Sequence, residues 1–207
     1  MNDYVVLELS SEMNNKLIYD IDNLLVPRNG IEDYYRSSDL PKSRECFTLN
    51  NVPFQFPEIS ADRNDNLSCE SKKIMIAKNK YSSIHFLCSG FPYYYNEKII
   101  LFFENQETEI IKIPFPAGNI GHRTRFMHEN SNEEVLQARS LSENSMLYIH
   151  HSFSNILNDN KLIAIEFPDN PFCHIFAITL GSKASKHKST SPEHSRPSSY
   201  TLMLESI

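Results

Sequence analysis

Three consecutive tyrosines, Tyr93, Tyr94 and Tyr95, are the residues best suited to bind a small polar ligand. An aromatic ring offers a flat apolar face on which a C–H patch of a sugar can stack. Asn96 and Glu97 follow directly and could hydrogen-bond to ligand hydroxyls. Because neighbouring side chains of a strand point in opposite directions, at most two of the rings can share a surface. The alternative is that one or two of them pack down as a lid on the domain core.

A second group of candidate ligand-binding residues lies between His122 and His128. Arg123 and Arg125 would project from one face of a strand about 7 Å apart, and two guanidinium groups so placed could bind a carboxylate or phosphate. The two histidines would line the opposite face. The alternative is a solvated strand whose arginines pair with nearby acids such as Glu129. If the protein has an active pocket, this segment is predicted to form its wall.

Metal and cofactor chemistry is not indicated by the remaining motifs. Among the histidines there is no HxH spacing, and His150 and His151, adjacent in a predicted strand, would face opposite ways. The Asp62–Asn66 loop carries oxygen ligands at alternating positions, but it lacks the Gly and terminal Glu of an EF-hand. We therefore favour an Asx-turn loop there, with calcium binding as the alternative. No nucleophile elbow, P-loop or dinucleotide motif is present, so we predict no metal and no cofactor and assign no catalytic residues.

The elements that must position these residues are short β-strands separated by turns. Only the segment 130–145 has helical propensity, and it is predicted to form a short helix or a covering loop. The segments 98–104 and 108–113 read as a hairpin of central strands buried on both faces. Segments 67–69 and 74–76 are expected to pair with each other. Further strands are predicted at 4–9, 46–49, 54–56, 83–88, 146–153, 162–167 and 173–180. This spacing predicts an all-β fold, an antiparallel β-sandwich or jelly roll.

The totals are those of a soluble, single-domain protein. The chain has 207 residues, of which 1–180 are predicted to form the sandwich and 181–207, rich in Ser, Lys, His and Pro, a disordered tail. A net charge of −6 argues against a nucleic-acid partner. No apolar run is long enough to span a membrane, and no secretory signal is visible, so a cytoplasmic location is expected. The four cysteines, Cys46, Cys69, Cys88 and Cys173, form no CxxC motif and are predicted to be reduced and buried.

Four segments in order resemble galactose-binding-like, jelly-roll β-sandwich domains, which often accompany bacterial glycoside hydrolases. They are Asn29-Gly30-Ile31, the VPFQFP segment 52–57 with the polar turns after it, YSSIHFLCSG at 81–90, and FPDNPFCHIFAITL at 167–180. The resemblance spans most of residues 20–180. It implies a β-sandwich and suggests carbohydrate binding.

The leading functional hypothesis is a non-catalytic module that binds a carbohydrate or another polar small molecule. The alternative is a small cofactor-independent enzyme of hydrolase, isomerase or cyclase type, using an Arg/His/Tyr-lined concave face. A third hypothesis is that the protein is a structural subunit that assembles with itself or with a partner protein. Exposed and coplanar tyrosines at 93–95 would favour binding, whereas tyrosines that roof a deep pocket containing Arg123, Arg125 or His128 would favour catalysis.

Overall fold

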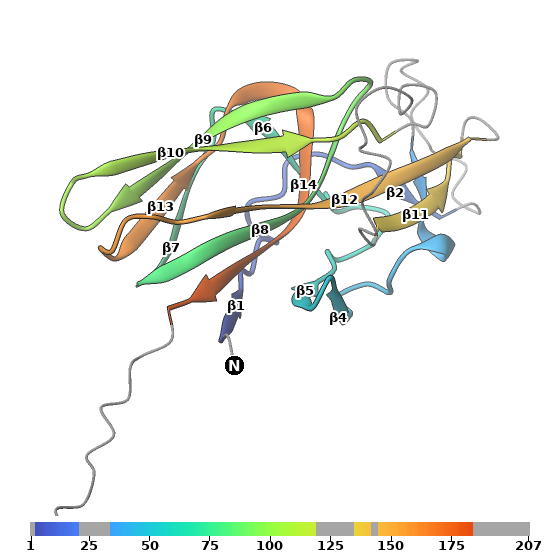
Figure 1. Cartoon of the computed structure of the whole chain (residues 1–207). Helices are drawn as coiled ribbons and strands as arrows, with labels where there is room; N and C mark the ends of the chain where they lie inside the picture. The colour runs from blue at the N-terminus through green and yellow to red at the C-terminus, as the bar shows by residue number, and fades with distance from the viewer. Residues whose placement is uncertain (1–2, 21–33, 119–134, 142–144, 184–207) are drawn as a thin grey trace, which may run out of the picture.

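The protein folds as a β-sandwich, as predicted. The computed structural model describes residues 3–20, 34–118, 135–141 and 145–183, and within them two antiparallel sheets pack face to face (Figure 1). A 3-10 turn, η1 (Ser37–Asp39), is the only helical element in these ranges.

The larger sheet has six strands, and it includes the strands predicted at 83–88, 146–153 and 173–180. Its order is β1-β14-β8-β12-β11, with β6 paired to the first part of β14. The strands are β1 (Tyr4–Val6), β6 (Leu67–Glu70), β8 (Tyr81–Gly90), β11 (Val135–Arg139), β12 (Met146–Asn155) and β14 (Asp169–Ser182).

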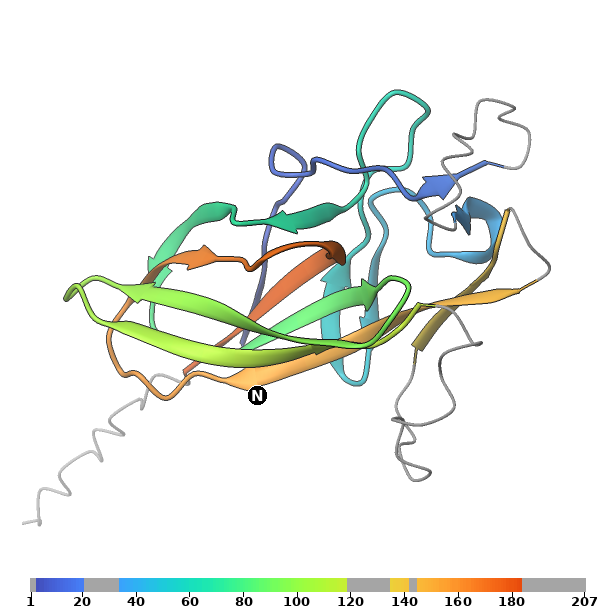
Figure 2. The same cartoon turned by 90° about the horizontal axis from the view of Figure 1, so that it is seen from above.

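The smaller sheet has four strands in the order β10-β9-β13-β7. They are β7 (Lys73–Asn79), β9 (Tyr95–Phe103), β10 (Thr108–Phe115) and β13 (Leu162–Glu166). The turn between β9 and β10 and the loop that follows β12 lie together at one end of the sandwich, opposite the loop that joins β8 to β9 (Figures 1 and 2).

Alternation along the strands creates the core between the two sheets. In β8, Ile84, Phe86 and Cys88 are fully buried against the smaller sheet, where they join Leu101 and Phe103 of β9. This is the shared face that the sequence predicted for these three residues, and it follows from the two-residue period of a strand.

The outer face of the larger sheet is covered by a second apolar cluster. Leu87 of β8 points into it, and the hairpin of β4 (Cys46–Leu49) and β5 (Val52–Gln55) packs over it through Val52 and Phe54. In Figure 1 this hairpin lies on the side of the larger sheet away from β9 and β10. A short parallel pair, β2 (Ile18–Tyr19) with β3 (Tyr35–Arg36), joins the same cluster.

The predicted helix at 130–145 is wrong in its described part. Residues 135–139 form β11, an edge strand that pairs with β12 through all five residues. Asp39 of η1 accepts hydrogen bonds from the Arg139 backbone N–H (3.0 Å) and from its guanidinium Nε (2.7 Å). Pairing with a long neighbour and this clamp together outweigh the local helical propensity of the segment.

Three further predictions need correction. β10 is an edge strand whose residues alternate between exposed and buried, so it is not a central strand buried on both faces. β6 and β7 do not pair with each other, because β6 pairs with β14 and β7 with β13. Cys46 is exposed, although Cys69, Cys88 and Cys173 are buried free thiols as predicted.

The last strand continues past position 180, the predicted end of the sandwich. β14 runs to Ser182, which pairs with Tyr81. The predicted disordered tail lies, from residue 184 onward, outside the described residues.

Candidate functional site

The loop between β8 and β9 presents the tyrosines that the sequence singled out. The side chains of Tyr93 and Tyr94 are 57% and 44% exposed. Phe172, at the start of β14, is 37% exposed and adds a third ring to this end of the sandwich. Tyr95 is half-buried, and its ring lies parallel to that of Phe172, with an interplanar angle of 8° and centroids 6.4 Å apart. We call Tyr93, Tyr94 and Phe172 the aromatic platform.

Backbone contacts hold the platform on the end of the larger sheet. The Phe91 N–H donates to the Phe172 carbonyl (2.9 Å), and this bond joins the loop to β14. Gly90 lets the chain turn close to its neighbours, because a Cβ there would lie 2.6 Å from the carbonyl oxygens of both Phe115 and Tyr93. The Tyr95 hydroxyl donates to the Phe91 carbonyl (3.3 Å). The exposed rings therefore project from a fixed base.

Polar groups adjoin the rings. Asn170 donates from its side-chain amide to Glu97 Oε1 (2.7 Å), and its Oδ1 accepts the Phe172 N–H (3.1 Å). Burial, with smaller contributions from Cys173 and other neighbours, raises the pKa of Tyr95 above its usual value. An exposed aromatic surface beside a carboxylate and an amide combines the two kinds of group that sugars require.

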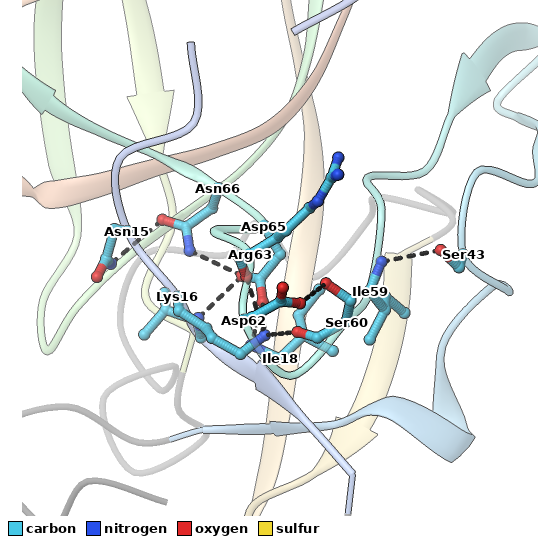
Figure 3. A network of polar contacts seen from close by, with 11 residues as sticks. Asn15, Lys16, Ile18, Ser43, Ile59, Ser60, Asp62, Arg63, Asp65 and Asn66 are labelled. Atoms are coloured by element: carbon cyan, nitrogen blue, oxygen red, sulfur yellow. Dashed lines mark hydrogen bonds and ion pairs between the residues drawn. The ribbon is translucent and has the colours of Figure 1, made fainter. Parts of the chain in front are cut away.

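A buried polar network lies in a different part of the molecule, around Asp65 (Figure 3). The carboxylate of Asp65 is fully buried and accepts the backbone N–H groups of Leu17 (2.9 Å) and Ile18 (3.1 Å). Its Oδ2 also lies 3.1 Å from Lys16 Nζ. Burial raises the pKa of Asp65, while these hydrogen bonds and the ammonium act in the opposite direction. The network joins the start of β2 to the loop before β6.

The Lys16 ammonium lies against the Asp62–Asn66 loop, for which the sequence offered calcium binding as an alternative. Nζ donates to the Ser60 carbonyl (2.7 Å) and the Arg63 carbonyl (3.2 Å) as well as to Asp65, so the oxygens of the loop surround a lysine. The positive charge that calcium would have supplied comes from the chain itself. In the part of the chain that the structure describes, no three His, Cys, Asp or Glu side chains are grouped so that they could hold a metal ion.

A hollow of about 390 Å³ adjoins this network. Its lining includes Lys16, Tyr19, Asp20, Ser37 and Ser60. An ammonium has three donors, and all three of Lys16 are used within the protein. The network therefore stabilises the structure beside the hollow and is not arranged to bind an anion.

The sequence analysis located one group of candidate residues and missed others. Tyr93 and Tyr94 are exposed as a binding role requires, whereas Tyr95 serves mainly as their support. Phe172 was missed because it lies far along the chain and only the pairing of β14 beside β8 brings it near. The other predicted site residues, His122, Arg123, Arg125 and His128, lie outside the described residues.

These features define a β-sandwich domain with an aromatic surface at one end. Residues 30–184 match the family described as the AziU2-like beta-sandwich domain, and the chain belongs to that family. No curated protein matches the sequence. Over the described residues, no helix has the length and apolar character needed to cross a membrane.

Proposed function

We propose that this domain is a non-catalytic module that binds a carbohydrate or a related polar small molecule on the aromatic platform. The observation that carries the proposal is the exposure of Tyr93, Tyr94 and Phe172, three large aromatic side chains at one end of the sandwich. Exposed aromatic side chains that gather on one surface commonly mark a binding site, because a ligand that covers them removes their apolar surface from water, which is favourable.

The chemistry of the surroundings supports a polar rather than a purely apolar ligand. Glu97 and Asn170 are hydrogen-bonded to each other beside the rings, and each retains capacity for further hydrogen bonds. A sugar could stack its C–H face on a tyrosine while its hydroxyl groups reach these side chains. The galactose-binding-like resemblance of the sequence makes galactosides the first ligands to test.

The test is a titration of the full-length protein with a panel of monosaccharides and oligosaccharides. Binding is measured by isothermal titration calorimetry and by NMR of the aromatic resonances. We expect Tyr93→Ala and Tyr94→Ala each to weaken binding about 10-fold, the equivalent of about 1.4 kcal/mol. Phenylalanine at either position keeps the ring, so Tyr93→Phe and Tyr94→Phe should retain most of the affinity if stacking dominates.

Leu157→Ala is the matched control. Leu157 is 82% exposed and lies in the loop after β12, next to Glu109 of β10 and at the opposite end of the sandwich from the platform. Its loss should leave the affinity unchanged. The proposal fails if no sugar in the panel binds, or if the alanine variants at 93 and 94 bind as well as the control does. Conversion of the sugar during the NMR titration would instead favour the alternative of a small cofactor-independent enzyme.

A further inference from the structure

Four polar side chains form a continuous hydrogen-bonded row on the outer face of the larger sheet. Ser83 Oγ lies 2.9 Å from His85 Nε2. The other nitrogen of His85, Nδ1, lies 3.1 Å from His151 Nε2. His151 Nδ1 lies 3.2 Å from the side-chain amide of Asn50. Every ring nitrogen of the two imidazoles is therefore engaged within the row.

The strand pairing produces this row. Ser83 and His85 are two apart in β8, so they share a face. His151, from the adjacent strand β12, is on the same face beside them, because Phe153 is directly opposite His85 and His151 is two residues before it. Asn50 reaches the row from the two-residue turn of the β4–β5 hairpin, where its φ is 50°.

The hydrogen bonds of the row have two possible assignments of donor and acceptor, which run in opposite directions. In one, the Asn50 amide donates to His151, His151 to His85, and His85 to Ser83. In the other, the Asn50 amide is turned by 180° and every donor becomes an acceptor, so that the Ser83 hydroxyl donates to His85 Nε2. The heavy-atom positions are the same in both, since the O and N of an amide differ only in assignment.

The second direction is the arrangement of an activated serine. A hydroxyl donates to Nε2 of a histidine, and a further group holds that histidine through its Nδ1–H. We propose that Ser83 is a nucleophile for acyl transfer, with His85 as its general base and with His151 and Asn50 as positioning residues. This activity goes beyond ligand binding at the aromatic platform and uses a different surface.

The reaction balances without a cofactor. Ser83 Oγ attacks the carbonyl carbon of an ester while its proton passes to His85 Nε2. The C–O bond of the ester then breaks, and the alcohol or phenolate leaves with its electron pair. A departing alkoxide takes the proton back from His85, whereas after a phenolate departs His85 releases its proton to the solvent. Neutral His85 then takes a proton from water as the water attacks acyl-Ser83, and it returns that proton to Ser83 Oγ when the acid is released.

The surroundings fix the position of the Ser83 hydroxyl and place aromatic rings beside His85. Gly181 is paired with Ser83 across the β8–β14 ladder, and a Cβ on it would collide with Ser83 Oγ. The side chain of Phe153 is 55% exposed and stacks on the His85 ring, with centroids 5.6 Å apart. Tyr4 meets the same ring edge-on at 5.9 Å. An apolar acyl chain would find its contacts on the exposed Phe153 ring beside His85.

The protonation state of His85 suits a base. Burial, and secondarily the neighbouring His151, lowers the pKa of His85 to about 4, so the imidazole is neutral and able to accept a proton at pH 7. The same shift makes it a weak base, and an activated ester is therefore the appropriate substrate class.

The test is incubation of the full-length protein with p-nitrophenyl acetate, with the release of nitrophenolate followed by absorbance and the protein followed by intact mass and peptide mapping. We expect one acetyl group on Ser83. Ser83→Ala should abolish that label, and His85→Gln should slow it about 100-fold. Ser82→Ala is the matched control, because the Ser82 hydroxyl bonds instead to the Gly181 carbonyl (3.2 Å) and should not matter.

Gly181→Ala is a variant in which none of the four residues of the row is changed. Its methyl group should turn the Ser83 hydroxyl out of line with His85, and we expect acetylation of Ser83 to fall at least as far as in His85→Gln, while circular dichroism shows an intact fold. A pH profile that stays level from pH 6 to pH 8 would support a base with a lowered pKa. The proposal is overturned if Ser83 is not labelled, if the label maps to lysines, or if folded Gly181→Ala reacts at the wild-type rate.

Discussion

Lys16 and Asp65 form an ion pair in which Nζ and Oδ2 lie 3.1 Å apart and the Asp65 side chain has no exposed surface. The carboxylate also receives two backbone N–H groups from the start of β2, so it orders the chain on both sides of the pair. A buried ion pair contributes little net free energy to folding. Removing one partner is nevertheless costly, because the other charge then stays buried without compensation.

Asp65→Asn should therefore destabilise the domain strongly. The asparagine amide would bring N–H groups toward the backbone donors of Leu17 and Ile18 and would leave the Lys16 ammonium without its counter-charge. We expect a loss of about 3–5 kcal/mol in the free energy of unfolding, measured by urea denaturation. Glu58→Gln, which breaks the surface pairs with Arg44 and Arg63, serves as the control and should cost less than about 1 kcal/mol. Equal losses in the two variants would contradict a central role for Asp65.

The sequence predicted the fold class and the strands of the core well, because two-residue alternation is a local signal. The face shared by Ile84, Phe86 and Cys88 could be read from spacing alone. Strand order could not be read in this way. No local feature of β10 indicates that it lies at the edge of its sheet, and none indicates which strands pair with β6 and β7.

The candidate sites show the same division between local and long-range information. Tyr93 and Tyr94 were found because they are consecutive in the sequence. Phe172 was not found, and neither was the contact between His85 and His151, because each depends on which strands pair. The calcium alternative at Asp62–Asn66 rested on local spacing alone, which could not reveal that Lys16, about fifty positions earlier, places its ammonium against the oxygens of that loop.

The stability of the domain should fall between pH 6.5 and pH 4. Burial lowers the pKa of His85 and of His174 to about 4 in the folded protein and also lowers that of His151, whereas an unfolded histidine titrates near 6.5. In this window the unfolded chain binds protons that the folded chain does not, so acid favours unfolding. Each histidine contributes at most about 1.4 kcal/mol per pH unit.

Urea denaturation at pH 7.5, 6.0 and 5.0 measures this dependence. His85→Gln should flatten it, because one of these three histidines is removed. Asp39→Asn is the control, since the pKa of Asp39 is lowered chiefly by its hydrogen bonds from Arg139 and its contribution is lost only as the pH falls below its unfolded value near 4. A stability that stays constant from pH 7.5 to pH 5.0 would contradict the neutral, buried state of the histidines.

Asp39 should matter for the attachment of β11. Its two carboxylate oxygens bind the guanidinium of Arg139 at 2.7 Å and 2.6 Å, and one of them also accepts the Arg139 backbone N–H. Because β11 is an edge strand, we expect Asp39→Asn to speed amide exchange in Val135–Arg139 several-fold while the rest of the sheet is unchanged.

The global effect on the free energy of unfolding should remain small, because the Arg139 side chain is 56% exposed and solvent screens its charge. Glu104→Gln, which removes the surface pair with Lys78, is the matched control and should leave exchange in β11 as it is. Uniform acceleration across the larger sheet in Asp39→Asn would show that the clamp supports the whole domain instead of one strand.

Gly90→Ala should disturb the base of the aromatic platform. The added Cβ would lie 2.6 Å from the carbonyl oxygens of Phe115 and Tyr93 and 2.9 Å from the Tyr95 ring. Backbone oxygens cannot rotate away as a side chain can, and Gly90 is itself tied by hydrogen bonds to Pro116 (2.7 Å) and Gly118 (2.8 Å). Crowding of this kind typically costs about 1–3 kcal/mol.

Thermal unfolding and the sugar titration separate the two consequences of this change. We expect a lower melting temperature and weaker binding, because the loop that carries Tyr93 must move to relieve the collision. Gly118→Ala is the graded comparison: its Cβ would meet the Tyr35 hydroxyl at 3.0 Å and other atoms at 3.6 Å, so the loss should be smaller. If Gly90→Ala is destabilised but binds sugar normally, the ligand does not depend on the orientation of the β8–β9 loop, and the platform is not its site.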